Sequence, residues 1–389
     1  MERLKGHYRR LLEQVNTDFT RYLYQRIDWN TRFIAILGAR GVGKTTMLLQ
    51  HIKKELPVNE TLYISADDLY FTENKLFDLA DDFYKNKGKF LFIDEIHKYA
   101  NWAKELKMMY DYFPDLKVVF TGSSVLEVYK GSDDLSRRVI SYYMQGLSFR
   151  EFLELKLKRK FDTCTIDEIT KHGVDIFQIP YPVALFKEHL KKGYYPFFDE
   201  TDYEIRLRNI INTSLEQDIP AFAKMNYATS QKLKHLLQIV AESVPFKPNH
   251  TKISELVGVH RNQIADFFHY LERAGMINQL RTDTKGIRAL GKVEKLYLEN
   301  PNLMHALAPQ TAGTGSIRET FFFNQTKLNN PVIASKQTDF AIGNLRFEIG
   351  GKSKNKEQIK GIENAYIVKD DIEYGYQHVI PLWHFGFNY

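Results

Sequence analysis

Between residues 33 and 46 the chain reads Phe-Ile-Ala-Ile-Leu-Gly-Ala-Arg-Gly-Val-Gly-Lys-Thr-Thr. The apolar run 33–37 predicts a buried strand, and residues 46–55 predict a helix. Between them, Gly38 to Thr45 fits G-x-x-x-x-G-K-[ST] at every fixed position. Glycines let such a loop turn tightly, so that successive N–H groups point at phosphate oxygens. Because the positive end of the following helix faces the same phosphates, the stretch predicts a triphosphate-binding loop.

The residues of this loop are the candidate nucleotide ligands. Lys44 is long enough to reach the outer phosphates, and the hydroxyl of Thr45 is placed to hold a magnesium ion. We therefore expect ATP and Mg²⁺ to bind here. The residues expected to line the phosphates are Gly38, Ala39, Arg40, Gly41, Val42, Gly43, Lys44, Thr45 and Thr46.

A second motif follows about fifty residues further on. Residues 90–93 predict a buried strand that leads directly into Asp94 and Glu95. Ligands of open α/β sheets bind at the carboxyl ends of the strands. There Asp94 can hold the magnesium ion, usually through water, and Glu95 can polarise the attacking water. Adjacent acids alone would be weak evidence, but after a phosphate loop they predict hydrolysis.

Polar residues near two further strands are candidates to sense the terminal phosphate. The strand predicted at 116–121 leads into Ser123 and Ser124; either can touch the γ-phosphate or the water, or belong to a plain turn. Arg137 and Arg138 precede another predicted strand, 139–144. We favour Arg138 to supply charge to the γ-phosphate, in cis or from a neighbouring subunit. The alternative is a basic pair on the surface.

Apolar spacing also predicts a leading helix between residues 4 and 28, a strand at 62–65 and a helix over 69–84. Asp67 and Asp68 follow that strand. They either lie near the site or cap a helix.

These motifs resemble the P-loop ATPases of the AAA type found in bacteria and archaea, the group that includes archaeal-type ATPases. Besides the loop, the resemblance over 30–155 rests on Phe-Ile-Asp-Glu-Ile-His (92–97), Phe-Thr-Gly-Ser-Ser (120–124), Ser-Arg-Arg (136–138) and Gly-Leu-Ser-Phe-Arg-Glu-Phe (146–152). It implies a five-stranded parallel sheet in which one strand separates the acid-bearing strand from the phosphate-loop strand. It also implies Ser123 as the sensor. The family has Gly-Arg where this chain has two arginines, so only Arg138 is carried over.

The resemblance extends to the domain plan, which is an ATPase domain at 1–150, a helical lid at 151–228, a winged helix-turn-helix at 229–300 and an α/β restriction-endonuclease-like domain at 301–389. For the third domain, helices predicted at 231–243, 251–257 and 260–274 precede strands at 276–280 and 295–298. From 230 to 300 there are eleven Lys and Arg and seven Asp and Glu residues. Arg261, Asn262 and Gln263 open the third helix, where base-reading residues sit in such modules. The module either binds double-stranded DNA or packs on the ATPase core and touches none.

The tail resembles the domain of unknown function that follows this ATPase type. Its pattern is a helix-borne Glu, a strand Asp and then Glu-x-Lys, matched here by Glu319 (helix 316–325), Asp339 and Glu348. Asp339 and Glu348 are candidate ligands of a second magnesium ion. Gly350 stands where the pattern has Lys, and on a continuing strand Lys352 would share the face of Glu348. We favour a degenerate scaffold for partner or DNA binding over an active nuclease. Residues 380–385 are expected to form a core strand.

Composition limits the remaining classes. A hydrophobic content of 43% and a net charge of +6 over 389 residues are typical of a soluble multidomain protein and permit, without requiring, nucleic-acid contact. Cys164 is the only cysteine, which excludes intramolecular disulfides and cysteine metal clusters and suits the cytoplasm. The first residues are polar, and no apolar run is long enough for a membrane helix.

The motifs together predict a Mg-dependent ATPase, a hydrolase that couples nucleotide state to the winged helix and the tail. The alternatives are a nucleotide-switched DNA-binding regulator, an ATP-gated nuclease, and a kinase acting on a small molecule. The acid pair argues against the kinase, because a reaction with water needs no acceptor pocket. A protein partner and an oligomer are compatible with the sequence.

Overall fold

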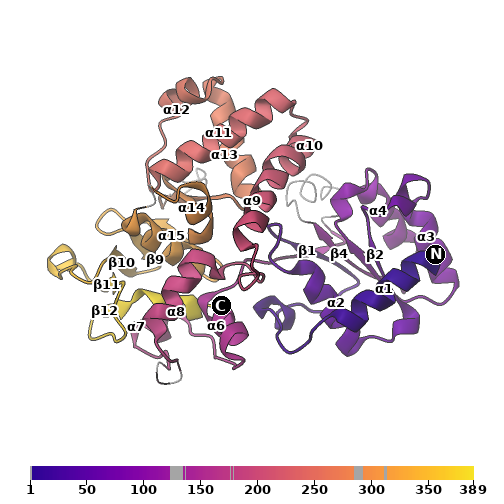
Figure 1. Cartoon of the computed structure of the whole chain (residues 1–389), viewed down its shortest axis with the longest axis horizontal. Coiled ribbons are helices and arrows are strands. Elements are labelled where there is room, and N and C mark those ends of the chain that lie inside the picture. Colours follow the sequence, from indigo (N-terminus) through magenta and orange to yellow (C-terminus); the bar gives the residue numbers. More distant parts are fainter. Residues whose placement is uncertain are drawn as a thin grey trace. The chain divides into compact units, whose positions relative to one another are not determined.

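The computed structural model describes residues 2–122, 135, 137–175, 177, 179–283, 292–310 and 313–389. The chain forms two compact units, Met1–Gly146 and Leu147–Tyr389 (Figure 1). The finer division into four domains stays a prediction.

The first unit is built on a five-stranded sheet. Its order is β2-β3-β4-β1-β5, and every pair of neighbours is parallel. The strand β4 thus separates β3, which ends in Asp94, from β1, which leads into the loop; this confirms the order expected from the resemblance. The strands are β1 (Phe33–Leu37), β2 (Thr61–Ser65), β3 (Phe90–Asp94), β4 (Lys117–Gly122) and β5 (Ile140–Tyr143).

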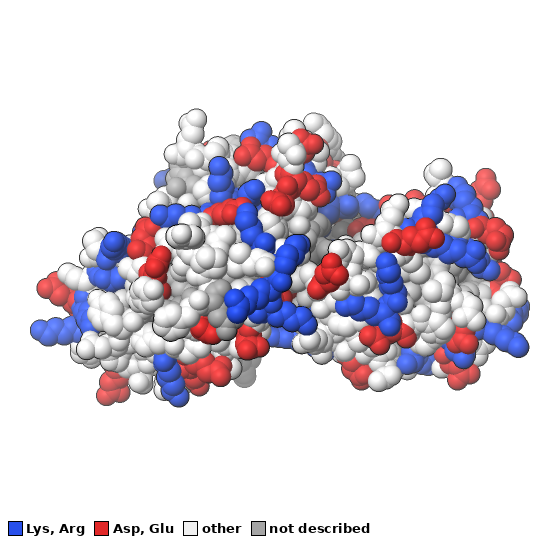
Figure 2. All heavy atoms as spheres, turned by 60° about the horizontal axis from the view of Figure 1, so that its bottom comes forward, with Lys and Arg blue, Asp and Glu red and all other residues white. Residues whose placement is uncertain are grey.

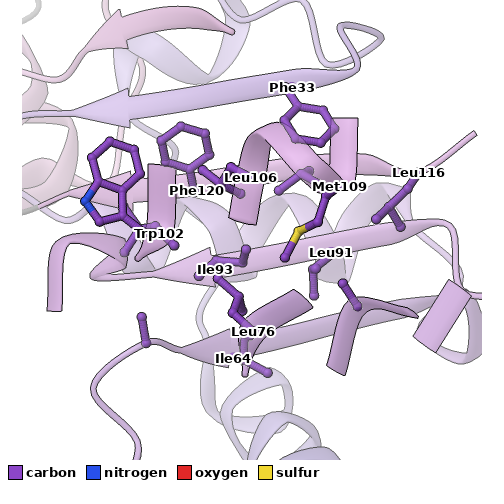
Figure 3. Close-up of a cluster of buried hydrophobic side chains, with 14 of the residues drawn as sticks. Phe33, Ile64, Leu76, Leu91, Ile93, Trp102, Leu106, Met109, Leu116 and Phe120 are labelled. Atoms are coloured by element: carbon purple, nitrogen blue, oxygen red, sulfur yellow. The ribbon is translucent and has the colours of Figure 1, made fainter. Parts of the chain in front are cut away.

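Helices cover both faces of this sheet, as expected when every connection between parallel strands is a crossover (Figure 1). The helices are α1 (Glu2–Gln14), α2 (Lys44–Glu55), α3 (Leu76–Lys85) and α4 (Trp102–Tyr112). Leu76 of α3 and Trp102, Leu106 and Met109 of α4 are buried with residues of the sheet in one core cluster. Figure 3 shows these side chains with Phe33, Ile64, Leu91, Ile93, Leu116 and Phe120. Burying each large apolar side chain contributes about 1.5–3 kcal/mol to the free energy of folding. The cluster therefore stabilises the sheet whose strands lead into the two motifs.

The leading helix predicted between 4 and 28 is too long. The helix α1 ends at Gln14, and a short 3₁₀ turn, η1 (Tyr22–Gln25), follows. The backbone N–H of Asp18 donates to Asn16 Oδ1 (2.7 Å) instead of continuing the helix. Short polar side chains offer the backbone this alternative partner.

The helix predicted over 69–84 is likewise split, into a 3₁₀ turn η3 (Leu69–Thr72) and α3. Asp68 caps the 3₁₀ turn, since its side chain accepts from Tyr70 N (2.7 Å). The capping role weighed for Asp68 is therefore confirmed.

The second unit begins with helices. They are α6 (Phe149–Leu157), α7 (Ile166–Thr170), α8 (Pro182–Glu188), α9 (Tyr203–Thr213) and α10 (Ile219–Ala223), with π-helical turns η6 (His189–Gly193) and η7 (Ser214–Asp218). Next come α11 (Tyr227–Ser243), α12 (His250–Val257) and α13 (Arg261–Arg273), then the antiparallel hairpin of β6 (Ile277–Arg281) and β7 (Val293–Leu298). Three helices followed by a hairpin were predicted at these positions, with boundaries that differ by a few residues.

The tail forms a mixed sheet with the order β12-β11-β10-β9-β8. Pairs β10–β11 and β11–β12 are parallel, and β8–β9 and β9–β10 are antiparallel. The elements are α14 (Pro301–Leu307), α15 (Thr314–Thr326), β8 (Val332–Ala334), β9 (Phe340–Ile342), β10 (Leu345–Gly350), β11 (Ala365–Lys369), β12 (Val379–Pro381) and the 3₁₀ helix η9 (Leu382–Phe387). The closing strand predicted at 380–385 is therefore wrong beyond Pro381: the residues are buried, but in a 3₁₀ helix.

None of the helices within the described residues is long and apolar enough to cross a bilayer.

Candidate functional site

The phosphate loop connects β1 to α2 in the conformation that its glycines allow. Gly43 caps α2 with a left-handed φ of 98°. A Cβ at Gly38 would lie 2.2 Å from the carbonyl oxygen of Met144, so the close approach of the loop to the end of β5 requires glycine. The first N–H groups of α2 have no acceptors within the helix, which leaves donors at the loop.

Lys44 folds back over the loop. Its Nζ donates to the carbonyl oxygens of Gly38 (2.9 Å) and Ala39 (2.8 Å), and the residue is 95% buried. A buried ammonium needs such partners, and phosphate oxygens would be stronger ones. The side chain thus lies in the loop as its predicted role requires.

Arg21, which the sequence analysis missed, supports the loop from behind. Its guanidinium donates to the carbonyl oxygen of Val42 within the loop, and to that of Gln145 (2.7 Å) beyond β5. Tyr22 binds the second of these segments, because its hydroxyl donates to Tyr143 O (3.1 Å) and accepts from Gln145 N (3.1 Å). No motif at fixed spacing marks Arg21; only the fold brings it to the loop.

Asp94 is the centre of a hydrogen-bond network that joins three strands and the loop. Its Oδ2 accepts from the hydroxyls of Thr45 (2.6 Å) and Tyr63 (2.8 Å). Thr121, at the end of β4, donates to Oδ1 and also accepts from Glu95 N (3.1 Å). Burial and the neighbouring Asp94 raise the pKa of the Tyr63 hydroxyl, so Tyr63 stays a donor. The two predicted magnesium ligands, Thr45 and Asp94, therefore meet, and Asp94 is held by Tyr63 and Thr121, to which the sequence analysis assigned no role.

These oxygens suit a magnesium ion. A hydroxyl and a carboxylate beside a phosphate site are the hard oxygen ligands that Mg²⁺ takes in proteins. The site thus offers one alcohol oxygen and one carboxylate group to such an ion.

Glu95 follows Asp94 with a left-handed backbone (φ 51°) and begins the 3₁₀ turn η4 (Ile96–Lys98). Its Oε2 lies 3.8 Å from the guanidinium of Arg40 in the phosphate loop and 3.4 Å from Nε2 of His97. Glu95, the residue predicted to activate water, thus lies at the carboxyl-terminal ends of the strands, near the phosphate loop.

Arg138 lies elsewhere. Within the parallel sheet Leu37, next to the loop, pairs with Tyr143, and Ile34 pairs with Ile140. Arg138 precedes Ile140 and thus lies near the amino-terminal ends of these parallel strands, whereas the loop of its own chain follows their carboxyl-terminal ends. Its guanidinium donates to Asp111 (3.2 Å), at the end of α4. The structure does not bring it to the phosphate site in cis, and a role in trans stays a prediction.

Ser123 and Ser124, the predicted sensors, lie outside the described residues. In β4 the polar side chain that contacts the acid pair is that of Thr121. Thr46, predicted to line the phosphates, is exposed on the first turn of α2, whereas the side chain of Val42 is fully buried.

The tail acids are held by lysines. Lys295 of β7 lies between Glu319 Oε2 (3.1 Å) and Asp339 Oδ1 (3.3 Å), and Lys354 Nζ lies 2.6 Å from Glu348. Burial, then Asp339, raises the pKa of Glu319. In the part of the chain that the structure describes, no three His, Cys, Asp or Glu side chains are placed to hold one metal ion. A site made by Asp339 and Glu348 therefore stays a prediction.

The role weighed for Lys352 is wrong in its geometry. The strand β10 ends at Gly350, and Lys352 is exposed in the turn that follows. Lys354 instead crosses Gly350, whose missing Cβ would lie 2.5 Å from the Lys354 side chain. The residue that contacts Glu348 is therefore six positions along, in a loop that no strand pattern would indicate.

The predicted base-reading residues open α13 and are exposed. The side-chain oxygen of Gln263 accepts a hydrogen bond from the N–H of His260 (3.1 Å) in a capping box. The side chains of Arg261 and Asn262 are exposed to solvent. On the face of the molecule drawn in Figure 2, basic and acidic side chains are interspersed over much of the surface. Neither observation by itself indicates DNA.

Comparison with known proteins agrees with the two motifs. Residues 30–153 match the family model of an AAA domain, and residues 183–314 match that of a domain of unknown function, DUF8612. An uncharacterised protein of Methanocaldococcus jannaschii is 27% identical over 265 residues, which are 63% of this chain and 55% of that protein. The chain thus spans about half the length of this curated relative.

Two solved structures are similar at lower identity. A Walker-type ATPase of Pyrococcus abyssi has a TM-score of 0.45 and 12% identity, covering 72% of this chain and 91% of that one. PCH-2 of C. elegans has a TM-score of 0.26 and 16% identity, covering 70% and 66%. The AAA-domain match implies ATP binding.

Proposed function

We propose that this chain binds Mg-ATP in its first unit and hydrolyses it to ADP and phosphate. The observation that carries the proposal is the 2.6 Å hydrogen bond between Thr45, which follows the loop lysine, and Asp94, which ends β3. Two motifs 49 residues apart in sequence thereby form one site with oxygen ligands for a metal and a lysine for phosphate.

The roles follow from the chemistry of each group. Lys44 binds the outer phosphates in place of the carbonyls of Gly38 and Ala39. Thr45 and Asp94 hold magnesium, which neutralises charge on the phosphates. Glu95 orients a water molecule and accepts its proton, a function that contributes about 10²–10⁴-fold in rate.

Two variants test the proposal. Lys44→Ala removes a charge-assisted phosphate contact and should weaken Mg-ATP binding at least about tenfold in calorimetric titration. Its control is Lys54→Ala, which removes an exposed lysine near the end of the same helix and should bind as the wild type does. Failure of the wild type to bind Mg-ATP would refute the proposal.

Glu95→Gln should keep nucleotide binding and lower turnover by about 10²-fold or more. If turnover is unchanged, Glu95 does not position the water and another group must be sought.

The second candidate is a nucleotide-switched DNA-binding regulator, supported by the three helices and hairpin of the predicted winged helix together with the exposed start of α13. Arg261 and Asn262 present a cation and an amide to solvent there. An electrophoretic shift of duplex DNA, with and without ATP, and its loss in an Arg261→Ala, Asn262→Ala double variant, test this role. In this second candidate, nucleotide binding in the first unit changes the affinity of the second unit for DNA.

A further inference from the structure

Arg40 is a cation of the phosphate loop, and its guanidinium lies near the carboxylate of Glu95. It lies within Gly38–Thr45, and its guanidinium is 3.8 Å from Glu95 Oε2. Their side chains are only 26% and 20% exposed, so water screens the two charges incompletely. The loop and the acid strand are thus linked a second time, beside the bond between Thr45 and Asp94.

Glu95 is held in this position from several directions. Its N–H donates to Thr121, its backbone is left-handed, and His97, whose side chain is 3% exposed, lies 3.4 Å from the same Oε2. The carboxylate therefore lies close to two basic side chains, those of Arg40 and His97. An acid engaged in this way is a weaker acceptor for the proton of a water molecule.

The position of Lys44 shows which phosphate would reach Arg40. Its ammonium rests on the carbonyls of Gly38 and Ala39, directly before Arg40 in the chain. A lysine of this loop binds the β- and γ-phosphates. The γ-phosphate of ATP is therefore expected beside the segment that carries Arg40. A nucleoside diphosphate has no γ-phosphate.

We propose that Arg40 distinguishes a triphosphate from a diphosphate by exchanging partners: it holds Glu95 in the absence of nucleotide and moves to the γ-phosphate when ATP binds, which frees Glu95 for water. The inference rests on the function proposed above. A guanidinium suits it, because its planar donors fit carboxylate and phosphate alike. The exchange is favourable because the γ-phosphate carries more negative charge than a carboxylate. ADP lacks the γ-phosphate and therefore leaves the Arg40–Glu95 pair intact.

The test is a double-mutant cycle read by calorimetric binding. Wild type, Arg40→Met, Glu95→Gln and the double variant are titrated with Mg-AMPPNP, which is not hydrolysed, and with Mg-ADP. Arg40→Met should weaken Mg-AMPPNP binding several-fold and change Mg-ADP binding less than twofold. Arg10→Met, which removes an exposed arginine of α1, is the matched control and should alter neither.

The cycle isolates the exchange. Glu95→Gln removes the partner that Arg40 must leave. We therefore compare two factors, the tightening of Mg-AMPPNP binding by Glu95→Gln in the wild-type chain and the tightening by the same change in the Arg40→Met chain. The first factor should be at least threefold larger than the second. With Mg-ADP the two factors should be equal. Equal factors with Mg-AMPPNP, or a larger one in Arg40→Met, would overturn the exchange.

Folding and the proposed function are controlled separately. Mg-ADP binding by each variant shows that its loop is intact. A wild type that binds neither nucleotide contradicts the ATPase proposal itself, whereas binding without the predicted difference contradicts only the role of Arg40.

Discussion

At the scale of single residues, Tyr63 makes the clearest stability prediction. Its buried hydroxyl donates to the Asp94 carboxylate (2.8 Å), and hydrogen bonds to charged groups contribute about 1.5–3 kcal/mol. Tyr63→Phe should therefore lower the free energy of unfolding of the first unit by about that amount in urea titrations.

The matched control lies against the same ring. Tyr8 of α1 stacks on Tyr63 with a centroid distance of 6.5 Å, and its buried hydroxyl has no hydrogen-bond partner among the described residues. Tyr8→Phe removes the same atom without a bond, so it should change stability by less than about 0.5 kcal/mol or stabilise the unit. Equal losses in both variants would show that the bond to Asp94 contributes nothing.

His51 makes a prediction about pH. It is buried on α2 and stacks on Trp29 (3.7 Å); burial, then Lys117, lowers its pKa to about 4. In the unfolded chain an imidazole binds a proton below about pH 6.5. Between these values the unfolded chain binds more protons than the folded one, so stability is lost as pH falls from about 6.5 to 4.

The measurement is the urea midpoint of the first unit across this range, followed by the fluorescence of Trp29. His51→Phe keeps the stacking and removes the titration, and it should flatten the loss. His7→Phe replaces an exposed histidine of α1 and should retain the wild-type slope. A slope that His51→Phe leaves unchanged would assign the effect to other groups.

At the scale of elements, strands and their order were predictable where chemistry and periodicity coincide. The runs at 33–37 and 90–93 are apolar throughout and end in motif residues, and both strands lie as predicted. Helices whose ends depend on local competition were predicted less well, as α1 shows where Asn16 and Asp18 intervene. Tyr63 and Arg21 could not be predicted as parts of the site, because their contacts join segments distant in sequence. Thr121 lies within the motif at 120–124, but the sequence assigned the sensor role to the serines that follow it.

The tail shows the same limit. The spacing argument for Lys352 assumed that β10 continues past Gly350, but two glycines end it and the chain turns. A hydrophobic pattern does not indicate where a side chain from a following loop returns over a strand, as Lys354 does.

The contact between β7 and α15 makes a prediction at this scale. Lys295 is the cation between Glu319 and Asp339, and its side chain is 31% exposed. Lys295→Met leaves two partly buried carboxylates together, so we expect a loss of about 1–3 kcal/mol in the second unit. Unfolding is followed by the fluorescence of Trp383, after replacing Trp29 and Trp102 by Phe.

Glu294→Gln on the same strand is the control. Glu294 pairs with Lys247 at 2.7 Å, but the two side chains are 32% and 57% exposed, and such surface pairs contribute about 0–1 kcal/mol. A loss in Lys295→Met no larger than that in Glu294→Gln would mean that the lysine does not link β7 to the tail.

At the scale of the whole molecule, the division of labour follows from where the site residues lie. Arg21, the loop, the acid pair and Gln145 all belong to Met1–Gly146, so the residues that we propose to bind Mg-ATP lie in the first unit. The lysine-bound acids of the tail belong to Leu147–Tyr389. Nucleotide should therefore stabilise one unit directly.

Tryptophan fluorescence can follow the unfolding of each unit separately, because Trp29 and Trp102 lie in the first unit and Trp383 lies in the second. At a hundred times its Kd, Mg-AMPPNP stabilises the state that binds it by about 2.7 kcal/mol, which raises the melting temperature of a unit this size by roughly 5–10 °C. In the Trp383→Phe chain the transition should move by that amount. In the Trp29→Phe, Trp102→Phe chain it should stay within about 1 °C, and Lys44→Ala should abolish the first shift. If both reporters move together, the two units unfold as one, and nucleotide acts on the whole chain through that cooperativity.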